Sequence, residues 1–200
     1  MKESESDKSK IGENAPYDNM RDEFTKGYVQ VYTGNGKGKT TAAVGLVVRA
    51  LGAGMRGFFA QFIKGARYSE IDMLDKLMEC SPPGALVCRQ YGEGCFIVRE
   101  AMESDRIAAE RGVADAREAL KSGNYDLVVL DEANVAVKLG LLAEDDLLSL
   151  IQDKPELVEL VFTGRGAPQA LIDRADLVTE MREIKHYYQN GVMARRGIES

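Results

Sequence analysis

Histidine, tryptophan and cysteine are scarce in this chain of 200 residues, which has one histidine, no tryptophan and three cysteines. The cysteines, Cys80, Cys88 and Cys95, are odd in number and form no C-x-x-C pair. A disulfide framework needs an even number of cysteines, and structural zinc sites use closely spaced pairs. We therefore expect reduced thiols rather than a disulfide scaffold or a zinc site.

Long apolar runs and basic clusters are also missing from the sequence. It has no run of about 18 apolar residues and no hydrophobic segment near its start, so neither a membrane span nor a secretory signal is predicted. With 26 Lys and Arg against 32 Asp and Glu, the net charge is −6. Binding to nucleic acid relies on neutralising phosphates. The composition therefore predicts a soluble, cytoplasmic protein with no nucleic-acid or membrane partner.

The first 26 residues differ in composition from the remainder. They hold seven acidic, five basic and only six apolar side chains. Such a segment cannot bury enough apolar surface to offset the entropy of ordering it. We predict a mobile N-terminal tail over residues 1–26 and a single folded domain over residues 27–200.

From Gly27 onward, short apolar runs alternate with longer helical patterns. Strands are expected at 28–33, 56–63, 86–91, 125–130, 157–163 and 177–183, and helices at 40–51, 69–79, 104–121, 144–152 and 168–174. This repeated strand-then-helix order implies right-handed crossovers, and it predicts an α/β fold with a mostly parallel central sheet and helices on both faces. Ligands bind such sheets at the carboxyl ends of the strands.

A glycine-rich loop, TGNGKGKTT at residues 33–41, follows the first expected strand. Its glycines let backbone N–H groups form an anion-binding nest, and the following helix dipole attracts the same anion. Lys39 places a positive charge against phosphates, and the Thr40 hydroxyl is placed to ligate Mg²⁺. Thr33 stands where the strict P-loop pattern has Gly, so this loop is a variant. A simple glycine-rich turn with solvated lysines is the alternative, which the flanking strand and helix disfavour.

Two acidic residues, Asp131 and Glu132, follow the apolar run 127–130. A carboxylate at the end of such a strand holds the metal in P-loop proteins. Two acids in a solvated loop are the plainer interpretation, but the glycine-rich loop in the same chain favours phosphate and metal binding. The residues alone leave hydrolysis, phosphoryl transfer and rarer reactions open.

The loop sequence TGNGKGKTTAA resembles that of the P-loop type of ATP:corrinoid adenosyltransferase. Other segments match that family from residue 27 to residue 199: RALG at 49–52, QFIKG at 61–65, VVLDE at 128–132, TGRG at 163–166, DLVTEM at 176–181, and GVMARRGIE at 191–199. The resemblance implies a P-loop NTPase-like (RecA-like) fold. It also implies transfer of the 5′-deoxyadenosyl group of ATP to the Co(I) of a reduced corrinoid, cob(I)alamin or cobinamide, with release of triphosphate.

The resemblance also implies site residues, cofactors and partners. It gives Mg²⁺ or Mn²⁺ as the metal, an electron-donating reductase or flavoprotein as partner, and a homodimer. Lys39, Thr40 and Glu132 are the candidate catalytic residues, and Thr40, Asp131 and Glu132 the candidate metal ligands. The candidate ATP-binding residues are Gly34, Asn35, Gly36, Lys37, Gly38, Lys39, Thr40, Thr41, Arg49 and Arg165.

Four further features carry less specific expectations. Phe96 is the aromatic residue in the segment where the family crowds the lower axial face of the corrinoid, although it is equally explained as a core residue. The tail of residues 1–26 is a candidate lid over the substrate site. Lys64 matches the family but is also explained as a solvated charge. His186, the lone histidine, is expected to be structural or to contact nucleotide, because the displacement has no proton to remove.

Two other functions compete with adenosyl transfer. A P-loop NTPase or small-molecule kinase would yield orthophosphate or a phosphorylated product, and a nucleotide-binding or corrinoid-carrier module would bind without turnover. The sequence disfavours the kinase because it shows no dedicated acid to deprotonate an acceptor. It disfavours the carrier because the D-x-H-x-x-G motif of corrinoid carriers is absent.

Overall fold

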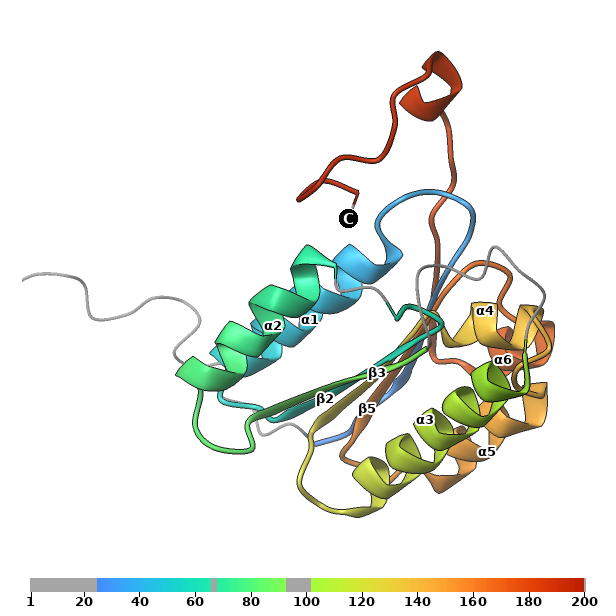
Figure 1. Ribbon diagram of the computed structural model, residues 1–200. Coiled ribbons are helices and arrows are strands. Elements are labelled where there is room, and N and C mark those ends of the chain that lie inside the picture. The colour runs from blue at the N-terminus through green and yellow to red at the C-terminus, as the bar shows by residue number, and fades with distance from the viewer. Residues whose placement is uncertain (1–24, 66–67, 93–101, 200) are drawn as a thin grey trace, which may run out of the picture.

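A parallel sheet forms the centre of the protein. The computed structural model describes residues 25–65, 68–92 and 102–199. Six strands lie in the order β3-β2-β4-β5-β1-β6, and every neighbouring pair is parallel (Figure 1). Their bounds are β1 Val29–Thr33, β2 Gly57–Phe62, β3 Leu86–Tyr91, β4 Leu127–Asp131, β5 Glu159–Thr163 and β6 Leu177–Glu180. The α/β fold predicted from the alternation of strands and helices is confirmed.

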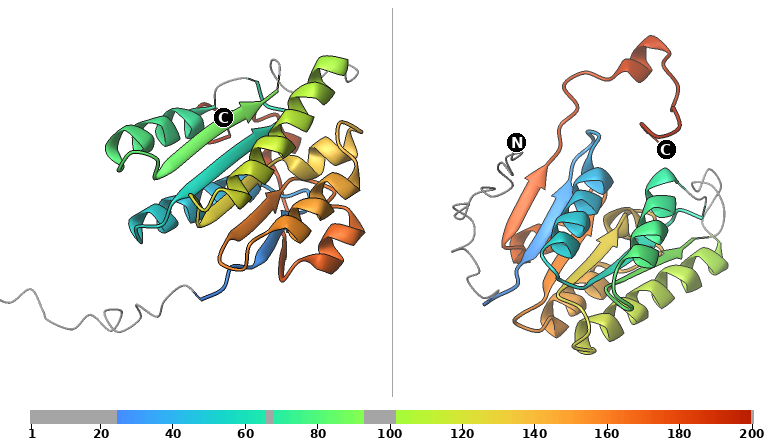
Figure 2. Two further views of the ribbon diagram at one scale, coloured as in Figure 1. Left: turned by 90° about the horizontal axis from the view of Figure 1, so that it is seen from below. Right: turned by 90° about the vertical axis from the view of Figure 1, so that its left-hand side faces the viewer.

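Helices cover both faces of this sheet, as Figures 1 and 2 show. Helices α1 and α2 pack on one face, and α3, α4, α5 and α6 pack on the other. Their bounds are α1 Lys39–Gly52, α2 Ser69–Cys80, α3 Glu103–Lys121, α4 Ala133–Lys138, α5 Glu144–Asp153 and α6 Gln169–Arg174, and a 3₁₀ turn spans Tyr187–Asn190. In the described part of the chain, no helix is long and apolar enough to span a membrane.

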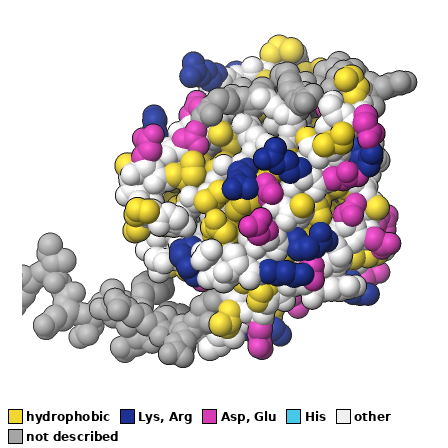
Figure 3. All heavy atoms as spheres, turned by 60° about the horizontal axis from the view of Figure 1, so that its bottom comes forward, with side chains coloured by type: hydrophobic (Ala, Val, Ile, Leu, Met, Phe, Trp, Pro, Cys, Tyr) yellow, Lys and Arg dark blue, Asp and Glu magenta, His cyan; other side chains and the backbone are white. Residues whose placement is uncertain are grey.

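The core has two layers because side chains alternate across the sheet. Phe59 and Val129 face α1 and α2, whereas Phe58, Val128 and Phe162 face the opposite helices. Every residue of β4 is buried, as expected for a central strand covered on both faces. The outer surface is solvated: Figure 3 shows positive and negative side chains interspersed on one face of the molecule.

Several expectations differ from the structure at the ends of elements. Helix α4 was not expected; it is only six residues long and follows β4 almost directly. Strand β6 ends at Glu180 rather than at residue 183, and all of its residues are exposed. Residues 1–24 and Phe96 lie outside the described residues, so the mobile tail, its lid role and the corrinoid contact stay predictions.

The C-terminal segment returns to the carboxyl ends of the strands. After β6 the chain runs away from the sheet, turns at the 3₁₀ helix and comes back toward the start of α1 (Figures 1 and 2). The Lys37 ammonium donates a hydrogen bond of 2.6 Å to the Ile198 carbonyl, which joins the end of the chain to the glycine-rich loop. Residues far apart in sequence therefore meet where a parallel sheet binds its ligands.

Candidate functional site

The glycine-rich loop between β1 and α1 needs glycine for its backbone shape and for its close packing. Gly34 and Gly38 have φ values of 94° and 119°, in the region that favours glycine. A Cβ on Gly36 would lie 2.8 Å from the carbonyl carbon of Arg182. The Gly36 N–H also donates a 2.7 Å hydrogen bond to the Met181 carbonyl. The loop is thus held against the segment after β6 by contacts that no side chain would permit.

Lys39, the first residue of α1, is folded into this loop. Its ammonium donates hydrogen bonds of 2.9 Å to the Gly34 carbonyl and 2.7 Å to the Gly36 carbonyl, and the residue is 7% exposed. Burial lowers the pKa of Lys39 below its usual value of 10.5, and the nearby Glu132 carboxylate partly offsets this effect. A buried cation with two carbonyl partners is well placed to attract phosphate oxygens.

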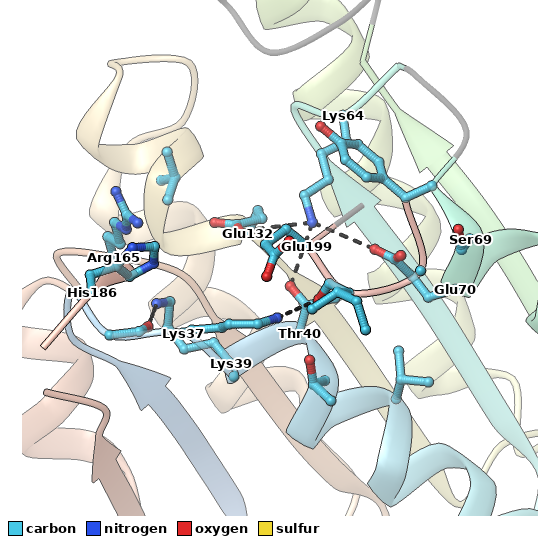
Figure 4. A pocket seen from close by; sticks show the side chains of 18 of the residues that line it. Lys37, Lys39, Thr40, Lys64, Ser69, Glu70, Glu132, Arg165, His186 and Glu199 are labelled. Atoms are coloured by element: carbon cyan, nitrogen blue, oxygen red, sulfur yellow. Dashed lines mark hydrogen bonds and ion pairs between the residues drawn. The ribbon is translucent and has the colours of Figure 1, made fainter. Parts of the chain in front are cut away.

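A cavity of about 830 Å³ opens beside the loop, a volume typical of small-ligand sites (Figure 4). Its lining includes most of the predicted ATP-binding and catalytic residues: Gly36, Lys37, Gly38, Lys39, Thr40, Thr41, Glu132 and Arg165. His186 and residues 197–199 of the C-terminal segment also line it. The structure therefore brings together the loop, the end of β4 and the last residues described.

Four predicted residues do not line the cavity. Gly34 and Asp131 are not among the lining residues: the Gly34 carbonyl accepts a hydrogen bond from Lys39, and Asp131 is fully buried. Asn35 and Arg49 are exposed. Arg49 lies in the last turn of α1, about 15 Å along the helix from Lys39 at 1.5 Å per residue, so its expected contact with the triphosphate is not supported.

The two carboxylates at the end of β4 have different surroundings. Asp131 accepts hydrogen bonds from Thr163 Oγ1 at 2.7 Å and from Gln61 Nε2 at 3.0 Å, one on each oxygen. Gln90 Nε2 donates in turn to Gln61 Oε1 at 2.9 Å. This polar row crosses β3, β2, β4 and β5 at their carboxyl ends. Asp131 therefore orients its neighbours, and the arrangement favours Glu132 as the metal ligand.

Glu132 turns toward the cavity because its backbone is left-handed, with φ 62°. Its N–H donates to Thr163 Oγ1 at 3.0 Å, and its side chain is 16% exposed. Burial, with a second contribution from the neighbouring Asp131 charge, raises the pKa of Glu132 above its usual value of 4.5. The fold therefore disfavours the charged carboxylate, which a cation in the cavity would stabilise.

Lys64 lies at the centre of the site, although the sequence analysis also allowed it to be a solvent-exposed charge. It is 8% exposed, and its ammonium lies 3.5 Å from Thr40 Oγ1 (Figure 4). The same nitrogen is 3.7 Å from Asp131 Oδ2, 3.9 Å from Glu70 Oε1 and 4.0 Å from Glu132 Oε1. The interpretation as a solvated charge is wrong. The available signal was the segment QFIKG at 61–65, which contains Lys64 and is one of the segments on which the resemblance rests.

The donor atoms around this point fit a hard divalent cation. Thr40 supplies a hydroxyl and Glu132 a carboxylate, which are the oxygen ligands that Mg²⁺ and Mn²⁺ prefer. Within the described ranges, no group of three or more Asp, Glu, His or Cys side chains is arranged to hold a metal alone. A cation here would therefore share its ligands with the phosphates of a nucleotide, as Mg²⁺ does in P-loop proteins.

His186 forms part of the cavity wall without a carboxylate partner of its own in the described hydrogen bonds. Its Nδ1 accepts a hydrogen bond of 3.1 Å from the Tyr188 N–H, and its ring lies 4.9 Å from that of Tyr187. These contacts fix the ring at the start of the 3₁₀ turn. The placement agrees with a structural or nucleotide-contacting residue.

A phosphate-binding loop after β1, a carboxylate after β4 and a parallel sheet define a P-loop nucleotide-binding domain. The family model of ATP:corrinoid adenosyltransferase BtuR/CobO/CobP matches residues 25–200. The chain is 39% identical over 179 residues to the corrinoid adenosyltransferase of Pseudomonas aeruginosa, which covers 90% of this chain and 85% of that protein. It is 33% identical over 175 residues to the corrinoid adenosyltransferase of Escherichia coli K12, covering 87% and 86% respectively. The chain belongs to the ATP:corrinoid adenosyltransferase family, which confirms the resemblance seen in its motifs.

Proposed function

We propose that the protein transfers the 5′-deoxyadenosyl group of ATP to the cobalt of a reduced corrinoid such as cob(I)alamin or cobinamide. Co(I) donates its electron pair to C5′, a Co–C bond forms, and the cobalt becomes formally Co(III). The C5′–O bond breaks at the same time, and its electrons leave with triphosphate. The family supports this reaction over the NTPase or kinase alternative.

The charge of the cavity is the observation that carries the proposal. Although the chain has a net charge of −6, five basic residues line the cavity (Lys37, Lys39, Lys64, Lys138 and Arg165), against three acidic ones (Glu70, Glu132 and Glu199). Preorganised positive charge stabilises negative charge that develops on a leaving group. In the reaction of this family, the phosphate loop would bind the departing triphosphate rather than a transferred phosphoryl group, so this positive charge would stabilise the leaving group.

A divalent cation, Mg²⁺ or Mn²⁺, would be held by the Thr40 hydroxyl and the Glu132 carboxylate. When bound, it supplies charge neutralisation to the phosphate oxygens. Asp131 keeps Gln61 and Thr163 in place, and Thr163 Oγ1 in turn accepts from the Glu132 N–H. Lys39 holds its charge beside the loop, and its carbonyl partners give the ammonium a fixed position. Because Co(I) is already a nucleophile, none of these groups needs to remove a proton.

An anaerobic assay with ATP, Mg²⁺ or Mn²⁺ and chemically reduced cobalamin tests the proposal. We expect a light-sensitive Co–C product that accumulates only when enzyme, ATP and reduced corrinoid are all present. A phosphorylated product, or orthophosphate released without corrinoid, would instead support the kinase or NTPase. ATP binding with no product under strong reductant would support a carrier.

The partners carried over from the resemblance are part of the same proposal. Co(I) must be generated from Co(II), so an electron-donating reductase or flavoprotein is the proposed physiological partner. A homodimer is proposed as the assembly, and light scattering of the purified chain measures its mass. A cytoplasmic location stays a prediction from composition.

A further inference from the structure

Lys64 has an unusual set of neighbours for a buried lysine. Oxygen atoms from Thr40, Glu70, Asp131 and Glu132 surround its ammonium at 3.5 to 4.0 Å, and they come from α1, α2 and the end of β4. None of them is at the 2.7 to 2.9 Å typical of a tight charge-assisted hydrogen bond. Among the residues that the structure describes, the ammonium therefore lies centrally between several oxygens and is not tightly bound to one carboxylate.

The backbone before Lys64 is bent in a way that few sequences tolerate. The Lys64 N–H donates a 2.8 Å hydrogen bond to the Phe62 carbonyl, which closes a three-residue turn around Ile63. Ile63 has φ 69°, which is a strained value for a β-branched residue and matches the rare form of the γ-turn. Gly92 allows this bend, since a Cβ there would lie 2.7 Å from the Ile63 carbonyl carbon. Strain of this kind persists where the surrounding structure requires it, often at functional sites.

A second strained residue lies on the other side of the same ammonium. Ile63 and Glu132 are the non-glycine residues with positive φ in the described part of the chain, and each follows one of the paired strands β2 and β4. The bend at Ile63 directs Lys64 toward the oxygens of Thr40, Glu70 and Asp131, and the bend at Glu132 directs its own carboxylate toward the same point. The two bends together place an internal cation beside Thr40 and Glu132, the oxygens that fit a divalent metal.

From this geometry we infer that Lys64 is a positioning residue that holds the metal position before nucleotide binds. The inference rests on the proposed function in one respect, that triphosphate is the anion bound. Two cations within about 4 Å repel strongly in a buried site, so a metal ion and the Lys64 ammonium cannot share these oxygens. Lys64 therefore prevents a metal ion from binding at this position without nucleotide. When a metal ion binds together with nucleotide, the ammonium moves away from these oxygens and contacts the triphosphate, where its positive charge stabilises the bound anion.

Two binding measurements on the full chain, both without corrinoid, test this role. The first is the affinity for Mn²⁺ alone, measured by electron paramagnetic resonance. The second is the affinity for inorganic triphosphate without metal, measured by calorimetry. For Lys64→Met we expect Mn²⁺ to bind about tenfold or more tightly, because the carboxylates lose their internal cation. Triphosphate should bind about tenfold or more weakly, because one charge-assisted contact is lost.

Matched variants separate this role from a structural one. Lys64→Arg keeps the positive charge and should leave Mn²⁺ binding as weak as in the wild type. Lys76→Met makes the same charge change at an exposed position on α2 and should change neither affinity. Lys64→Gln provides the same two measurements if Lys64→Met does not fold.

The two affinities of the Lys64→Met variant must change in opposite directions. If both fall together, or if neither changes, Lys64 does not hold the metal position and the inference is overturned. Failure of the wild type to form the Co–C product would overturn the proposed function instead, and it would leave these corrinoid-free measurements intact.

Discussion

Replacing Lys39 by alanine removes the cation most closely built into the phosphate loop. The ammonium is 7% exposed and lies within hydrogen-bond distance of two loop carbonyls, so its charge is held in a partly desolvated position. A unit charge about 4 Å from an anionic oxygen contributes about 4 kcal/mol at an effective dielectric constant of about 20. Because about 1.4 kcal/mol corresponds to tenfold in rate, Lys39→Ala should lower kcat/KM about a thousandfold.

The stability of the Lys39→Ala variant should change much less than its activity. Two hydrogen bonds to carbonyls are lost, at about 1 kcal/mol each. The lowered pKa of Lys39 shows that burying its charge is unfavourable, and removing the charge offsets part of that loss. Thermal unfolding followed by circular dichroism should therefore show a folded protein with a modest shift in Tm.

Lys37→Ala is the matched control for this experiment. Lys37 belongs to the same loop but is exposed, and its ammonium donates to the Ile198 carbonyl rather than to the loop. Exposed charges are screened by solvent, so its loss should lower activity about tenfold or less. The anaerobic Co–C assay measures both variants. Near-normal activity of a folded Lys39→Ala protein would refute the role assigned to the loop.

Three other substitutions give separable outcomes. Glu132→Gln should abolish most of the metal-dependent activity and raise the Tm at pH 7, because the fold raises the pKa of this carboxyl and so disfavours its charged form. That gain in Tm should shrink as the pH falls through the raised pKa and vanish below 4.5; a Tm difference independent of pH would contradict the assignment. His186→Ala should leave the chemical step largely intact, so a new pH-dependent collapse of kcat would identify a base. Asp131→Ala leaves Thr163 and Gln61 without their acceptor and should destabilise the protein by about 2 kcal/mol or more in denaturant unfolding; an unchanged midpoint would argue against the buried polar row.

The fold was predictable because its signals are local. The apolar run at 127–130 is fully buried in β4, and the helical pattern at 104–121 lies within α3. Helix α4 was not foreseen because its six residues follow Glu132 without a start signal, whereas α6, which is equally short, begins directly after Pro168. The predicted end of β6 at residue 183 was also wrong. The Met181 N–H still donates a hydrogen bond to the Thr33 carbonyl, but the chain then leaves the sheet. No residue pattern marks the point where it leaves.

The site residues could be predicted only where they belong to a sequence motif with a known chemical role. The phosphate loop and the acidic pair carry spacings with a physical meaning, and the structure places Lys39, Thr40 and Glu132 around one cavity. The central position of Lys64 depends on the pairing of β2 with β4, strands that are not consecutive in the chain. A strained turn at Ile63 then directs the side chain, and neither feature can be derived from residue types alone.

The phosphorus product of one anaerobic turnover tests the central claim most directly. Enzyme, ATP, divalent metal and chemically reduced cobalamin are mixed under limiting corrinoid, and phosphorus NMR follows the products alongside the absorbance of the Co–C bond. The account predicts one inorganic triphosphate for each Co–C bond formed, with none released when corrinoid is omitted. Orthophosphate that appears at the same rate without corrinoid would contradict it.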